Sequence, residues 1–117
     1  MPEPFDFLNQ IVGEKLSAVT FVSDYYHFPY DGPTFNVLTP VSIESAAGRA
    51  ISGDDQFRNL VCGQIAKNIR FVSVREGDAI TLTFEDDSTI RFSLKPEDYP
   101  GPEAVVFFGN ADVWEVF

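Results

Sequence analysis

The chain has 117 residues, 44% of them apolar, and a formal net charge of −10. The length fits one domain, residues 1–117, and the apolar share is enough for a core, so disorder of the whole chain is not expected. Nucleic acid and anionic membranes repel a net anion, and no run approaches the roughly 18 apolar residues of a membrane span. Neither is therefore expected as a partner.

Cys62 is the single cysteine, and the first residues lack the basic start and the apolar run of a signal peptide. A chain without disulfides fits a reducing compartment. The sequence therefore predicts a cytoplasmic protein.

Acidic charge is concentrated toward the two ends of the chain. Residues 1–48 carry a net charge of −5, residues 49–95 are neutral, and residues 96–117 carry −5. This excess either keeps the protein soluble or attracts a basic partner protein.

Residues 5–40 predict a short helix followed by three strands. Apolar side chains at helical spacing occur in "PFDFLNQIVGEKL". Strands are expected around residues 19–23, 25–28 and 34–38, with a turn at Asp31-Gly32.

Residues 41–53 predict a hairpin that turns at Ala47-Gly48 and leads to a second helix. This helix begins the segment 54–96, with Asp54 and Asp55 as candidate N-cap residues.

The rest of the segment 54–96 predicts three strands in a meander. The first strand presents to the core either Ile69 and Phe71 or Val72 and Val74. The second and third alternate cleanly, which is typical of antiparallel strands with one buried face. We expect this face to consist of Ile80, Leu82, Phe84, Ile90, Phe92 and Leu94.

The letters Phe-Val-Ser occur twice, at residues 21–23 and 71–73. Aligning Gly13 with Gly63 superposes the two predicted units, so the sequence predicts an α+β fold with a mainly antiparallel sheet built from two duplicated helix-plus-β-meander units. A three-stranded sheet cannot bury its apolar face alone, so the two copies are expected to pack about a pseudo-twofold axis.

The C-terminal segment 97–117 begins with a loop rich in Pro and Gly and ends in "AVVFF" and "DVWEVF". The pattern does not separate helix from strand at residues 102–108. Because apolar chain ends are normally tied down, this segment is expected to form an inner strand or to contribute to a homodimer interface.

Residues able to perform catalysis are few. His27 and Cys62 form the one available base–nucleophile pair, no phosphate-binding loop occurs, and there is no Cys/His set for zinc. Acidic residues are plentiful, but nothing in the sequence selects a pair for acid–base chemistry. The sequence therefore predicts no catalytic residue, no metal site and no cofactor, and favours a binding protein over an enzyme.

Five aromatic rings crowd the stretch from Tyr25 to Tyr30. Two interpretations stay open. Alternate rings fill the core while Tyr25 and His27 line the wet face, or the stretch forms a binding surface that Trp114 extends. The candidate binding residues are Tyr25, Tyr26, His27, Tyr30 and Trp114.

The stretches "CGQIAKNIRFVSV" and "LTFEDDSTIRFSLKPEDYPGPEA" resemble small acidic bacterial proteins of unknown function, mainly over residues 60–104. Some similar proteins serve as immunity proteins that neutralise toxins. The resemblance implies a non-catalytic protein-binding module and transfers no functional residue; Asp87 stands where the pattern has Gly. The alternative is a small-molecule or saccharide binder, or a hydrolase, that uses Tyr25–Tyr30 and nearby carboxylates.

Overall fold

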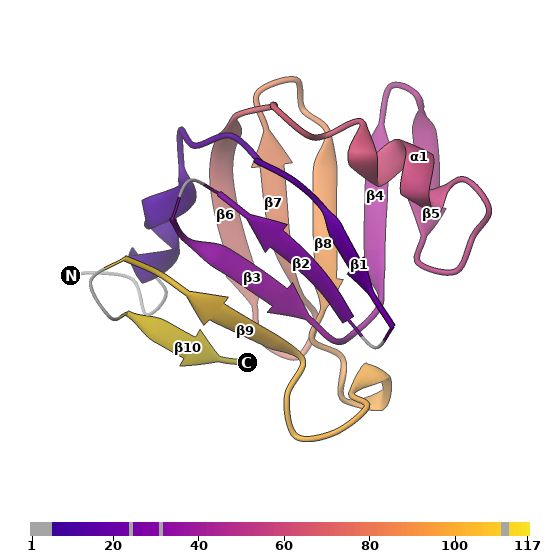
Figure 1. The fold of residues 1–117 in the computed structure, drawn as a ribbon. Helices are drawn as coiled ribbons and strands as arrows, with labels where there is room; N and C mark the ends of the chain where they lie inside the picture. The colour runs from indigo at the N-terminus through magenta and orange to yellow at the C-terminus, as the bar shows by residue number, and fades with distance from the viewer. Residues whose placement is uncertain (1–5, 24, 31, 111–112) are drawn as a thin grey trace.

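The chain forms two antiparallel five-stranded sheets packed face to face, in a computed structural model that describes residues 6–23, 25–30, 32–110 and 113–117 (Figure 1). Sheet 1 has the order β1-β2-β3-β9-β10, with β1 (Thr20–Val22), β2 (Tyr25–Pro29), β3 (Thr34–Val37), β9 (Val105–Phe108) and β10 (Trp114–Val116). Sheet 2 has the order β5-β4-β8-β7-β6, with β4 (Val41–Ser45), β5 (Gly48–Ile51), β6 (Ile69–Arg75), β7 (Ala79–Phe84) and β8 (Thr89–Ser93). The predicted mainly antiparallel sheet structure is confirmed.

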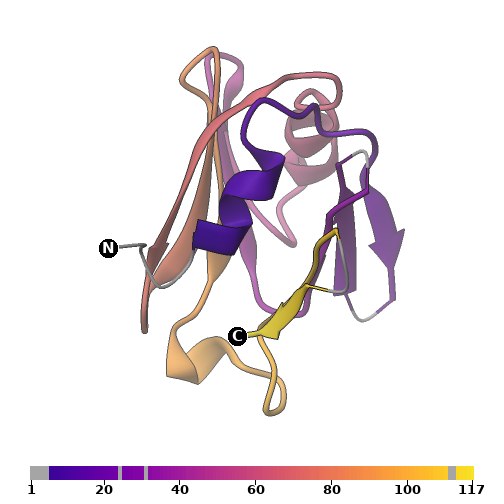
Figure 2. The same ribbon diagram turned by 90° about the vertical axis from the view of Figure 1, so that its left-hand side faces the viewer.

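Short helices close two opposite open sides of the sandwich. Figure 2 shows the layers edge-on, with η1 (Asp6–Ile11) in front and α1 (Phe57–Cys62) behind. The Phe7 ring of η1 lies 5.8 Å from the Phe107 ring, and the Phe57 ring of α1 lies 5.5 Å from the Tyr26 ring. With η2 (Pro96–Asp98), these helices make up the helical part of the described residues.

The core lies between the sheets. Phe92 of sheet 2 packs against Phe28 and Phe35 of sheet 1, with ring centroids 5.1 and 5.2 Å apart. The predicted buried face of β7 and β8 is confirmed, because successive side chains of a strand point to opposite sides. Its members Ile80, Leu82, Phe84, Ile90, Phe92 and Leu94 are all buried.

Strand β6 follows neither predicted alternation along its whole length. Ile69 is buried, whereas Phe71 is 48% exposed. Val72 and Val74 are half-buried and pack against the core. An irregularity between Ile69 and Phe71 shifts the pairing with β7, so the inward-facing positions change there.

The predicted caps of α1 are wrong. The helix begins after Gln56, without a side-chain cap. The Asp54 carboxylate instead accepts a hydrogen bond from the Ile51 amide at 2.9 Å, which stabilises the turn after β5. A local turn therefore competes successfully for this side chain.

The C-terminal segment is a hairpin whose first strand is internal. Strand β9 lies between β3 and β10, and its residues Val105 and Phe107 are fully buried. The ambiguity at residues 102–108 is thus resolved as strand from Val105 onward.

The Phe-Val-Ser alignment is not supported by the strand register. Tyr26 lies opposite Val37 as Ile80 lies opposite Phe92, so Tyr26 and Ile80 hold corresponding places in the two meanders. Phe21 lies opposite Tyr26, but Val74 rather than Phe71 lies opposite Ile80. The repeated letters are three positions out of register.

Candidate functional site

An apolar groove of about 390 Å³ runs over the outer face of sheet 1. We call it the sheet 1 groove. Its lining consists of Tyr25, Asn36, Leu38, Glu103, Val106, Phe108, Trp114 and Val116. Six of these side chains are apolar or aromatic, one is an amide and one is a carboxylate, and no base lines the groove within the described residues.

Alternation in the C-terminal hairpin creates this surface. Phe108 lies opposite Trp114, and Val106 lies opposite Val116. Because β9 buries its intervening residues in the core, these four side chains project from the other face. Trp114 is 62% exposed and Phe108 is 42% exposed, so apolar surface of the kind found at protein contacts is displayed to solvent.

Two of the five predicted binding residues meet in the groove. Tyr25, half-buried in β2, and Trp114, exposed in β10, both line it although they are far apart in the sequence. His27 lies opposite Asn36 and is half-buried, but it does not line the groove.

The other two predicted residues differ in burial: Tyr26 is half-buried and lines a separate hollow of about 490 Å³ beside α1, whereas Tyr30 lies in the interior. Tyr26 packs against Phe21 and Phe57, with ring centroids 5.8 and 5.5 Å away. Tyr30 is fully buried, and its hydroxyl has no hydrogen-bond partner among the described residues. Burial raises the pKa of Tyr30 well above its ordinary value. Phe28 and Tyr30 therefore fill the core, as the first interpretation expects, whereas Tyr26 only borders it.

The sequence did not single out the remaining lining residues, among them Asn36 and Glu103. The Asn36 Oδ1 atom is buried and has no hydrogen-bond donor among the described residues. Val106, Phe108 and Val116 belong to the stretches "AVVFF" and "DVWEVF" of the C-terminal segment, in which residues on both faces of a strand would be apolar. This pattern could not be interpreted without knowing that β9 pairs with β3.

The strands of sheet 1 come from the two acid-rich segments of the chain. Residues 1–38 and 96–117, which include all strands of sheet 1, hold ten of the 18 acidic and one of the eight basic residues, a net charge of −9. Residues 39–95, which include all strands of sheet 2, have a net charge of −1. Of the described acidic residues in these segments, Glu103 lines the groove and Glu115 lies in the adjoining β10, whereas Asp98 accepts a hydrogen bond from Ser93 of β8 in sheet 2.

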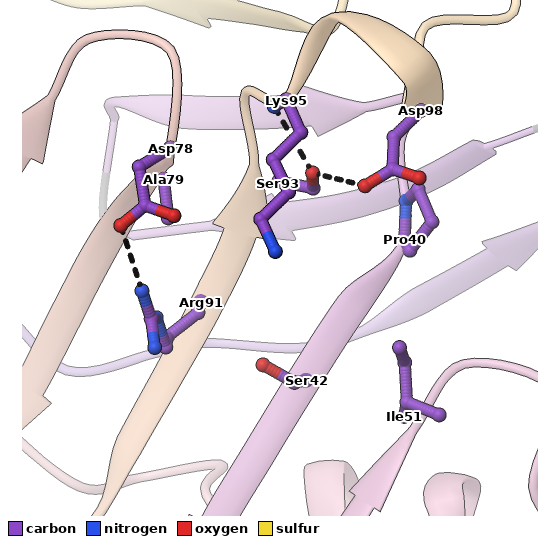
Figure 3. Close-up of a pocket in the computed structure, with 9 residues that line it drawn as sticks. All are labelled: Pro40, Ser42, Ile51, Asp78, Ala79, Arg91, Ser93, Lys95 and Asp98. Carbon is purple, nitrogen blue, oxygen red and sulfur yellow. Dashed lines mark hydrogen bonds and ion pairs between the residues drawn. The ribbon is translucent and has the colours of Figure 1, made fainter.

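A second, smaller hollow of about 210 Å³ lies on the outer face of sheet 2 (Figure 3). Arg91 donates to Asp78 at 3.2 Å, and the Ser93 hydroxyl donates to Asp98 at 2.5 Å. Figure 3 shows the Lys95 side chain reaching down into the hollow beside these groups. Opposite charges here neutralise one another, and the serine faces a carboxylate instead of the imidazole that would activate it.

The His27–Cys62 pair, noted in the sequence as the one available base–nucleophile pair, gains no support from the geometry. His27 lies in sheet 1, whereas Cys62 ends α1 and is exposed rather than on a buried face. In the described part of the chain, no group of three His, Cys, Asp or Glu side chains is placed to hold a metal ion. Nor does any described helix have the length and apolar character needed to cross a membrane.

No protein-family model, curated protein or solved structure matches this chain.

Proposed function

We propose that the protein is a non-catalytic binding module that docks a basic partner protein on the outer face of sheet 1. The observation that carries this proposal is an exposed apolar and aromatic groove with the Glu103 carboxylate in its lining and no basic residue among its described lining residues. An apolar, aromatic-rich centre supplies binding energy, and surrounding carboxylates attract and orient a partner of opposite charge.

The sequence resemblance to small acidic bacterial proteins supports an immunity-like role for this module. An immunity protein binds and neutralises a toxin, so it needs an interaction surface and no catalytic residues of its own. The lone, exposed Cys62 fits a reducing compartment such as the cytoplasm.

Small-molecule binding or hydrolysis is the alternative class. Those functions generally need a deep pocket with converging polar groups. The stretch Tyr25–Tyr30 instead divides between the two faces of β2, and only Tyr25 lines the groove. This division favours the protein-binding function.

Homodimer formation through the same surface is disfavoured by charge. Two copies meeting at this face would bring together the Glu103 and Glu115 carboxylates of both copies, in a sheet whose chain segments 1–38 and 96–117 together carry −9 per copy. Like charges across an interface oppose association, most strongly at low salt.

Capture from the native host, followed by mass spectrometry, tests the proposal. The bait is the full chain, with Phe108→Ser/Trp114→Ser as the groove variant and Phe71→Ser as a matched exposed Phe on sheet 2. We expect a basic protein that the wild type and Phe71→Ser capture, that the groove variant loses, and that raised salt releases.

The proposal fails if the groove variant retains the partner or if the captured protein is acidic. It also fails if light scattering shows a dimer that the groove variant breaks, because the groove would then join two copies of this chain.

We further propose that the fold is an internal duplication in which the two units exchange hairpins. The Gly13 amide donates to the Ile69 carbonyl at 2.7 Å, and the Ala66 amide donates to the Leu16 carbonyl at 2.8 Å. The two donors, Gly13 and Ala66, are 53 positions apart, and so are the two acceptors, Leu16 and Ile69. This common spacing supports a pseudo-twofold relation between the two units.

Strand order gives independent support to the duplication. Sheet 1 is the meander β1-β2-β3 extended by the hairpin β9-β10, and sheet 2 is the meander β6-β7-β8 extended by the hairpin β4-β5. The buried pair Phe35–Phe107 in sheet 1 corresponds to the buried pair Ile90–Ile43 in sheet 2.

Co-expression of residues 1–53 and 54–117 as separate chains tests this architecture. Each half lacks the hairpin that completes its sheet, so we expect each alone to be unfolded and the pair to assemble with the circular dichroism spectrum of the intact protein. Halves that fold alone would contradict the exchange.

A further inference from the structure

The sheet 1 groove has the chemical character of a site for a positively charged hydrogen-bond donor. Its polar groups include the Glu103 carboxylate and the Asn36 amide, and the rings of Tyr25 and Trp114 line it as well. A carboxylate accepts hydrogen bonds, and an aromatic face attracts a cation.

Asn36 adds an acceptor that lacks a donor. Its Oδ1 atom is buried without a hydrogen-bond partner among the described residues. An unsatisfied buried acceptor costs about 1–3 kcal/mol. A donor brought by a ligand would relieve that cost once the Asn36 side chain turns its buried Oδ1 atom toward the groove, so the groove gains from a ligand with several N–H groups.

We propose that the groove binds an arginine side chain of the basic partner, with the guanidinium plane against Trp114 or Tyr25 and its N–H groups directed to Glu103 and Asn36. This inference rests on the proposed function. A guanidinium is preferred to an ammonium because it is planar, offers five donors in a fixed fork, and is less strongly hydrated. Arginine and tryptophan are also common anchors at protein interfaces.

The hollow on sheet 2 provides an internal contrast. It contains Arg91 and Lys95 beside its acids, so it offers a cation no net attraction (Figure 3). Binding of an arginine side chain is therefore not expected in this hollow.

Trp114 is the single tryptophan of the chain, so its fluorescence reports on the groove directly. The probes are the peptides acetyl-(Gly-Arg)4-amide, its lysine analogue and its citrulline analogue, which is nearly isosteric with arginine but uncharged. We expect a saturable fluorescence change with the arginine peptide, weaker binding of the lysine peptide, and at least tenfold weaker binding of the citrulline peptide.

Two substitutions separate groove contacts from general electrostatics. Glu103→Gln removes the carboxylate that lines the groove, and Glu115→Gln removes one on β10 that does not. We expect Glu103→Gln to weaken arginine-peptide binding at least fivefold and Glu115→Gln less than twofold. Asn36→Ala should also weaken it, and circular dichroism checks that each variant is folded.

Equal binding of the arginine and citrulline peptides, or equal effects of Glu103→Gln and Glu115→Gln, would overturn the inference. The outcome is distinguishable from failure of the proposed function. If the groove variant loses the captured partner while the arginine peptide leaves Trp114 fluorescence unchanged, the docking face stands and the arginine site does not. If the peptide binds but capture is unaffected by the groove variant, the proposed function fails.

Discussion

Gly13 and Ala66 occupy corresponding places beside the antiparallel Lys15–Asn68 bridge, and both have positive φ, 86° for Gly13 and 77° for Ala66. Glycine adopts this conformation freely, whereas alanine is strained in it by about 1–2 kcal/mol. Nothing lies within 4 Å of a Cβ atom built on Gly13, so an alanine side chain there would meet no steric clash. Backbone strain is therefore the cost that distinguishes alanine from glycine at these positions.

Ala66→Gly should therefore stabilise the protein, and Gly13→Ala should destabilise it. After the greater flexibility of glycine in the unfolded chain is subtracted, we expect changes of about 0.5–1 kcal/mol in each direction. Urea denaturation measures both. Ala47→Gly, at a residue without positive φ, serves as the control and should lower stability. A destabilised Ala66→Gly variant would argue against strain at this position.

Phe84→Ala should lower the free energy of unfolding by about 3–5 kcal/mol, because the ring is fully buried and its removal leaves a cavity. Phe71→Ala is the matched control in the same sheet, since that ring is 48% exposed. Its effect should stay below about 1 kcal/mol. Similar melting temperatures for the two variants would show that the assigned faces of β6 and β7 are wrong.

Tyr30→Phe should leave stability unchanged or raise it by about 1 kcal/mol, because it removes a buried hydroxyl that has no partner among the described residues. Because burial raises the pKa of Tyr30, its ionisation is disfavoured in the folded state, and alkaline pH should promote unfolding. Absorbance titration should show one fewer late-ionising tyrosine in the variant. A loss of more than about 1 kcal/mol would reveal a hydrogen bond to this hydroxyl.

Asp86 should stabilise the protein at neutral pH and lose this effect in acid. The ion pair with Lys67 at 2.7 Å and hydrogen bonds from Ser88 hold the pKa of Asp86 well below its ordinary value of 3.8. The stabilisation is therefore complete above that ordinary value and decreases as the pH falls toward the folded-state pKa.

Since the Asp86 side chain is 48% exposed, Asp86→Asn should cost only about 0.5–1 kcal/mol at pH 7, and less at pH 3. Urea denaturation of wild type and variant at both pH values measures the difference. Asp87→Asn, at the neighbouring and more exposed carboxylate, is the control and should cost less. A difference that does not depend on pH would contradict the assigned role.

Deletion of residues 105–117 should abolish folding or solubility, because it removes β9 and uncovers the buried Phe35 and Val37 of β3. Deletion of residues 114–117 removes edge strand β10 and Phe117, which packs against the border of the core, so it should leave a folded, soluble protein of lower stability. Circular dichroism and light scattering compare the two. A soluble and unchanged 105–117 deletion would contradict the pairing of β9 with β3.

Local sequence pattern was enough to predict the strands and the buried face of β7 and β8. Their side chains alternate without interruption, so the period alone identifies which residues face the core. The pattern failed at β6, because the irregularity after Ile69 changes which side chains point toward the core. It also failed at Asp54, which stabilises a turn instead of capping α1. Repeated letters misled at Phe21 and Phe71, because identity in sequence does not define register in a sheet.

By itself, the sequence determined an antiparallel β protein with an acidic excess at both ends, since period and charge are local properties of the chain. Only the tertiary structure decided that β9 pairs with β3, and therefore that strands from both ends of the chain form one sheet. The same pairing places Tyr25 and Trp114 in one groove. Pairing between strands distant in sequence depends on how two apolar faces cover each other, and that complementarity leaves no signature in either strand alone.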